Sequence, residues 1–142
     1  MTAVTAYAGS QRTEPPSPIY LMGLAALVFT SAVLCLELTW QGNRIAGIWL
    51  GNAFVLAPLL QHRRRYWVAL LSVAYAANVC ADLVIGDPSI RSAVTPSFNV
   101  VEVLMVALPM RYFRLDRDFT RTQSLIPFYL LAAGPAPFLA AV

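Results

Sequence analysis

Five polar side chains lie inside long apolar stretches of this 142-residue chain, in which 58% of the residues are hydrophobic. The run SFNVVEVLM holds Asn99 and Glu102, AYAANVCAD holds Asn78 and Asp82, and IWLGNAFVLAPLL holds Asn52. Amides and carboxylates in such settings can bind a ligand, join one helix to another or, as an acid and base pair, move protons. These five residues are the candidate site for sensing a ligand or signal.

The spacing places Asn99 and Glu102 on one helical face, and Asn78 and Asp82 on another, because residues three or four apart are neighbours on a helix. We expect the two pairs to face each other across a helix interface. A charged side chain at the centre of a membrane span costs about 2.5–3.5 kcal/mol on insertion scales, so it normally faces protein or a water-filled cavity. Two interpretations stay open: interhelical hydrogen bonds that only stabilise packing, or a polar pocket toward the outer side, which Glu37 could join.

The elements that carry these residues are predicted to be transmembrane helices. Only 12% of the residues are charged, about half the share in an average soluble domain, and apolar blocks alternate with short basic loops. Five spans are expected, over residues 19–38, 45–60, 66–85, 96–110 and 124–142. The fold class is therefore all-α, a polytopic transmembrane helical bundle. Small residues in the third span, Ala74, Ala77 and Ala81, should let another helix approach closely.

The arginines orient this bundle. All ten basic residues are arginine, and eight of them fall in the N-terminal tail, the turn HRRR and the loop RYFRLDRDFTR, against Arg44 and Arg91 elsewhere. Basic loops stay in the cytoplasm, so a multi-pass membrane protein with a cytoplasmic N-terminus is predicted. Orientation explains the arginines better than phosphate binding does, and nucleic acid is not expected as a partner beside the lipid bilayer. The basic residues singled out in the cytoplasmic loops are Arg63, Arg64, Arg65, Arg111 and Arg114.

The thiols and the imidazole predict neither a metal site nor a cofactor. Cys35 and Cys80 lie in apolar runs with no second thiol or histidine at ligand spacing, so both are expected to be small buried side chains. His62 begins the run HRRR and is expected to be a solvated loop histidine.

Taken in order, these motifs resemble the MASE1 domain, a membrane-associated sensor of bacterial histidine kinases, diguanylate cyclases and phosphodiesterases. The resemblance rests on IWLGNAFVLAPLL, RRRYWVALL, YAANVCADL and FNVVEVLMVALPMRYF. It covers residue 19 to the end, and Leu50 departs from the proline or small residue common in the family. The family's polar positions fall on Asn52, Asn78, Asn99 and Glu102. Family members have about eight transmembrane helices, so a truncated sensor domain over residues 19–142, after a disordered cytoplasmic tail over residues 1–18, is expected.

The resemblance implies a sensory input domain that relays an unidentified signal to a cytoplasmic GGDEF, EAL or histidine kinase module absent from this chain. A membrane partner protein is a further candidate. The alternative is a fragment of a transporter or permease, since those proteins also use intramembrane carboxylates and broken helices. An enzyme is not expected, because no serine and histidine arrangement or zinc motif accompanies Asp82 and Glu102.

Overall fold

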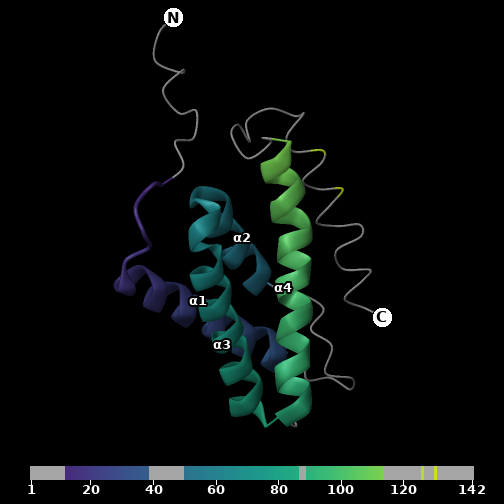
Figure 1. Cartoon of the computed structure of the whole chain (residues 1–142). Helices are drawn as coiled ribbons and strands as arrows, with labels where there is room; N and C mark the ends of the chain where they lie inside the picture. The colour runs from purple at the N-terminus through teal and green to yellow at the C-terminus, as the bar shows by residue number, and fades with distance from the viewer. Residues whose placement is uncertain (1–11, 39–49, 87–88, 114–125, 127–129, 131–142) are drawn as a thin grey trace, which may run out of the picture.

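The computed structural model describes residues 12–38, 50–86, 89–113, 126 and 130, and every structural statement below concerns these residues. They form four α-helices and one 3-10 turn: α1 (Pro18–Leu38), α2 (Gly51–Gln61), η2 (Arg64–Tyr66), α3 (Trp67–Ile85) and α4 (Ser89–Tyr112). In Figure 1, α3 and α4 run side by side in opposite directions, and α1 crosses them obliquely. Three segments are long and apolar enough to cross a membrane: Pro18–Glu37, Arg64–Ile85 and Ser92–Tyr112.

The start of α1 is fixed by Ser17 and Pro18. The Ser17 hydroxyl accepts a hydrogen bond from the backbone N–H of Tyr20 at 3.2 Å, which satisfies one of the unpaired donors of the first turn. Pro18 occupies the first helical position, where a missing N–H costs nothing and the fixed φ suits the helix. The helix then matches the predicted first span, residues 19–38.

Small residues bring α1 and α3 together. Ala74, Ala77 and Ala81 of α3 are all buried, and Leu24 and Val28 of α1 belong to the same core. Alanine lets two helix backbones approach closely, which is how membrane helices gain packing without a hydrophobic driving force between them. The predicted contact face of this helix is confirmed.

A left-handed residue ends α3. Gly86 has φ 87°, and its backbone N–H bonds to the carbonyls of Asp82 and Leu83, as in the common glycine stop of a helix. The next helix, α4, runs back in the opposite direction to α3 (Figure 1).

The fourth helix is longer than predicted, because Pro96 lies inside α4 rather than at its start. A proline in a helix removes one backbone hydrogen bond and disturbs the preceding turn. Here the nearby carbonyl of Ala93 accepts hydrogen bonds from the hydroxyls of Tyr75 on α3, at 2.8 Å, and Ser97, at 3.2 Å. Neighbouring helices and serine side chains are the usual means by which membrane helices tolerate proline, so the predicted start near Pro96 was wrong.

The second predicted span is only partly described. Helix α2 has 11 residues, or about 17 Å of helix, which is shorter than a hydrocarbon core of about 30 Å. Residues 45–49 of that predicted span lie outside the described residues, as does the fifth predicted span apart from positions 126 and 130. The count of five spans therefore stays a prediction.

Candidate functional site

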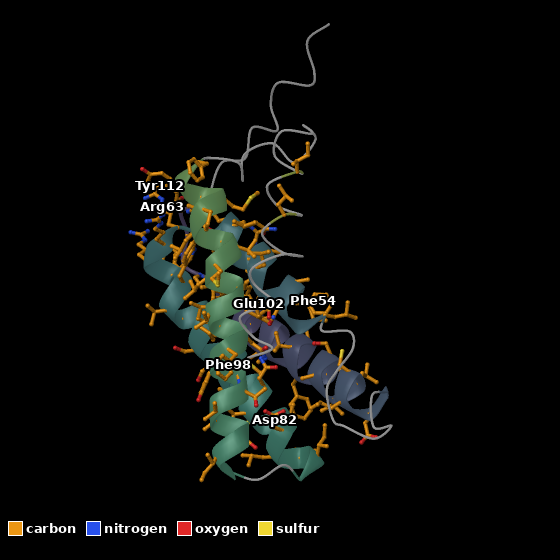
Figure 2. The ribbon with its side chains drawn as sticks, turned by 90° about the vertical axis from the view of Figure 1, so that its right-hand side faces the viewer. Phe54, Arg63, Asp82, Phe98, Glu102 and Tyr112 are labelled. Carbon is orange, nitrogen blue, oxygen red and sulfur yellow. The ribbon has the colours of Figure 1, made fainter. Side chains whose placement is uncertain are left out.

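A polar pair joins α2 to α4 in the middle of the bundle. The side-chain amide of Asn52 donates a hydrogen bond from Nδ2 to Oε2 of Glu102 at 2.8 Å. Figure 2 shows Glu102 at the level of Phe54, midway between the end that bears Arg63 and the end near Asp82. The first turn of α2 has no acidic residue and no side-chain cap of its own. Glu102 therefore places a carboxyl group at the first turn of α2, the positive end of the helix dipole.

This partner differs from the predicted one. The residue spacing predicts that Asn99 and Glu102 face Asn78 and Asp82, whereas Glu102 bonds to Asn52. Asp82 is buried, but it lies toward the turn between α3 and α4 and not at the level of Glu102 (Figure 2). The predicted pairing was wrong for Glu102, because helical periodicity gives the inward face of a residue but not the helix that it meets.

Asn78 and Asn99 have incomplete hydrogen bonding. Asn78 is 5% exposed, and its Nδ2 donates to the Ala74 carbonyl of its own helix at 3.0 Å. Within the described part of the chain, Oδ1 of Asn78 and Nδ2 of Asn99 are buried without a partner. A buried polar atom left unsatisfied costs about 1–3 kcal/mol. One amide thus offers an acceptor and the other a donor.

The two amides lie at similar heights in the bundle. Asn78 is seven residues before the end of α3 at Ile85, and Asn99 is ten residues after the start of α4 at Ser89. At 1.5 Å per residue the difference is about 5 Å, or one helical turn. The unpaired acceptor on α3 and the unpaired donor on α4 therefore differ in height by about one helical turn.

A second polar junction lies at the other end of α2. The last carbonyls of a helix have no partner within the helix, and here other elements supply the missing donors. We call the four carbonyl groups the α2 carbonyl cluster: those of Leu59, Leu60, Gln61 and His62. Trp67 of α3 donates from Nε1 to Leu59 O at 2.8 Å, and the backbone N–H of Arg12 donates to Gln61 O at 2.9 Å.

Arg111 of α4 donates hydrogen bonds to the α2 carbonyl cluster. Its guanidinium donates to Leu60 O at 3.0 Å and to His62 O at 2.9 Å, with a longer contact of 3.4 Å to Leu59 O. The same guanidinium lies 5.7 Å from the centre of the Trp67 ring, within the range of a cation–π interaction. A positive charge at the C-terminal end of a helix also complements the helix dipole.

Both junctions connect α2 to α4, and their spacing along the chain shows how the two helices are oriented. The mid-bundle bond joins residues 50 apart, and the Arg111 bond to Leu60 joins residues 51 apart. Helices α2 and α4 therefore run parallel here. Hydrogen bonds to α4 hold α2 at its first turn and at its last turn. A displacement of α2 along its axis must either move α4 with it or break one of the two junctions.

The basic residues chosen from the sequence divide into two groups. Arg63, Arg64 and Arg65 are exposed, as expected of a loop. Arg111 was predicted as a loop residue, but it lies in the last turn of α4 and bonds to α2. Its position at the end of an apolar helix was the one signal for such a role. Arg114 lies outside the described residues.

The prediction for His62 was wrong. The residue is 2% exposed, its Nδ1 lies 3.0 Å from Pro58 O, and its ring lies 5.4 Å from that of Tyr20. The segment before α1 covers it, since Arg12 pairs with His62 across a single β-bridge. Such a contact between positions fifty residues apart has no local sequence signal.

The two cysteines also differ from each other. Cys35 is buried, as predicted, whereas Cys80 is exposed on α3 and that prediction was wrong. Over the described ranges, no group of three or more His, Cys, Asp or Glu side chains comes together to hold a metal ion.

Comparison with known proteins identifies the family. The family model MASE1 matches residues 20–142. A probable diguanylate cyclase, DgcE of Escherichia coli strain K12, is 24% identical over 122 residues, which is 85% of this chain but 11% of that protein. The chain thus spans about a tenth of the length of the curated relative. No solved structure matches. With membrane-spanning helices that carry the motifs FNVVEVLM and RRRYW, and a family match over most of its length, this multi-pass membrane chain belongs to the MASE1 family.

Proposed function

We propose that this chain is the sensory input domain of a bacterial signal transduction protein, and that it passes a signal received in the membrane to a cytoplasmic effector module. The match of the MASE1 model to residues 20–142 carries this proposal. The similarity to a probable diguanylate cyclase supports a GGDEF-type module as the effector, with EAL and histidine kinase modules as the other candidates. The chain itself is proposed to have no enzymatic activity.

The two junctions between α2 and α4 supply a mechanism. A ligand shifts an equilibrium only by binding one arrangement more tightly than another. A signal that changes the bond between Asn52 and Glu102 changes how α2 is held in mid-bundle, and the Arg111 contacts carry that change to the end of α4. Residues after α4 would then pass it to the effector.

The candidate sensing residues remain Asn52, Asn78, Asp82, Asn99 and Glu102. The unsatisfied amide atoms of Asn78 and Asn99 support a role in recognising a polar group, because their hydrogen bonds are incomplete in this arrangement. Hydrogen bonding between helices alone is the competing explanation, and it fits the satisfied pair of Asn52 and Glu102 best.

The proposed setting is the bacterial inner membrane with a cytoplasmic N-terminus. The segment before α1, the η2 turn and the end of α4 lie at one end of the bundle, because Arg12, Arg65 and Arg111 all make contacts there. This clustering agrees with the positive-inside orientation. A transporter fragment is the second candidate, favoured by a carboxylate inside the segment Ser92–Tyr112, and proton flux into proteoliposomes would identify it.

The decisive test is a chimera. The matching segment of the E. coli relative is replaced by this chain, and cyclic di-GMP is measured in cells that carry the chimera. We expect the chimera to be active and the substitutions Glu102→Gln and Arg111→Gln to change its output at equal protein level. Leu108→Ala, on an exposed site of α4, is the matched control. An active chimera whose cyclic di-GMP level is unchanged by both substitutions would contradict the proposal.

A further inference from the structure

Four exposed arginines gather at one end of the bundle, although one of them is distant in sequence. Arg63, Arg64 and Arg65 follow α2 directly. Arg12 joins them because its backbone N–H bonds to Gln61 O at 2.9 Å. We call these four residues the arginine rim.

Contacts hold much of the arginine rim in place. The Arg65 guanidinium donates to Thr13 O at 2.9 Å, and the Tyr66 hydroxyl donates to the same oxygen at 3.1 Å. Arg65 also lies 4.6 Å from the centre of the Tyr66 ring, and Arg64 lies 5.8 Å from that of Trp67. Side chains ordered in advance lose less entropy when they bind. The rim is therefore a partly preorganised positive surface.

Exposed aromatic rings lie at the same end. Tyr112 and Phe113 are 76% and 65% exposed and contact each other edge to face. Figure 2 shows Tyr112 beside the end that bears Arg63. Tyrosine and other amphipathic rings favour the headgroup level of a membrane. The candidate spans Arg64–Ile85 and Ser92–Tyr112 also end here, which favours a position of the arginine rim near the lipid phosphates.

We infer that the arginine rim binds the phosphate groups of anionic phospholipids in the leaflet that it faces. The planar guanidinium matches phosphate oxygens with two parallel donors. Glu14 is the carboxylate of the neighbouring segment, and it leaves the four arginines in excess. Basic groups next to a membrane span gain affinity for anionic lipid residue by residue. This inference does not depend on the proposed sensory function.

Native mass spectrometry of the full chain tests the inference. The purified protein is exchanged into mixed micelles that contain equal amounts of phosphatidylglycerol and phosphatidylcholine, and the retained lipids are counted. We expect phosphatidylglycerol to be enriched on the wild-type chain. The triple substitution Arg63→Gln, Arg64→Gln, Arg65→Gln should reduce that enrichment, by roughly fivefold for each arginine that binds.

Two further variants separate lipid binding from folding and insertion. The triple substitution to lysine keeps the charges that set orientation but loses the paired donors of each guanidinium, so it should retain only part of the enrichment. Arg91→Gln, near the opposite end of α4, should leave it unchanged. If the glutamine triple variant does not insert, Arg12→Gln takes its place and should lower the enrichment about fivefold. Equal retention of the two lipids by the wild-type chain, or unchanged enrichment in the glutamine variants, would overturn the inference.

Discussion

Asn52 donates a hydrogen bond to Glu102 at 2.8 Å, and this bond fixes where the short helix α2 meets α4. A carboxylate inside an apolar bundle needs a partner, because water is not there to solvate it. The amide of Asn52 is that partner, and the first turn of α2 adds the positive end of its dipole. This contact holds the first turn of α2 against α4, and the bonds from Arg111 to the α2 carbonyl cluster hold its other end.

The first prediction concerns the strength of this bond. Asn52→Ala and Glu102→Ala should each lower the free energy of unfolding, and the double variant should lose less than the sum. The expected coupling energy is about 0.6 kcal/mol and at most about 1.7 kcal/mol, the range measured for hydrogen bonds between membrane helices. Titration with SDS gives the free energy of unfolding of the wild type, the two single variants and the double variant. A control cycle pairs Asn52→Ala with Leu108→Ala, at an exposed position, and its losses of stability should add. Strictly additive losses in the cycle of Asn52 and Glu102 would contradict the prediction.

The second prediction concerns Arg111. Arg111→Gln should lower the free energy of unfolding by about 1.5–3 kcal/mol, because charged hydrogen bonds to the α2 carbonyl cluster are lost. Arg111→Lys keeps the charge but not the fork of donors, so it should recover only part of the stability. Amide hydrogen exchange should increase for residues 59–62 in the glutamine variant. An effect equal to that of Arg64→Gln, whose guanidinium is exposed, would show that the carbonyl contacts do not stabilise the fold.

Sequence patterns predicted the helices better than their ends. The apolar blocks gave α1 and α3 almost to the residue, since length and composition determine which segments cross a membrane. They place the start of the fourth helix near Pro96, whereas α4 begins at Ser89 and contains Pro96 in its interior. The hydroxyl of Tyr75, which donates to the Ala93 carbonyl in the turn before that proline, comes from another helix and is not visible in a local pattern.

The candidate site was predicted in part. Composition correctly singled out Asn52 and Glu102 as polar residues within the bundle, but their pairing across 50 residues depends on how the helices assemble. The α2 carbonyl cluster was missed for a different reason. Its acceptors are backbone carbonyls, which every residue possesses, so sequence composition cannot mark them.

The third prediction separates two glycines. Gly86→Ala should lower the free energy of unfolding by about 1 kcal/mol, because its φ of 87° is unfavourable for a residue with a Cβ atom. Nothing lies within 4 Å of the added Cβ atom, so the cost comes from the backbone alone. Gly23→Ala is the matched control: it has the same open space but ordinary helical geometry, and it should be neutral or stabilising by up to about 1 kcal/mol. Equal effects at both positions would contradict the prediction.

The fourth prediction concerns orientation in the membrane. The arginine rim lies at one end of the bundle and the start of α4 at the other, so cysteines placed at the two ends should lie on opposite sides of the membrane. In a background with Cys35→Ala and Cys80→Ala, a membrane-impermeant maleimide added to intact spheroplasts should label Ile90→Cys, whose native side chain is 82% exposed. Gln61→Cys, exposed at the other end, should react only after lysis. The reason is that moving basic loops across the membrane is disfavoured. Labelling of Gln61→Cys in intact spheroplasts while Ile90→Cys stays protected would reverse the orientation, and the arginine rim would then face the outer leaflet.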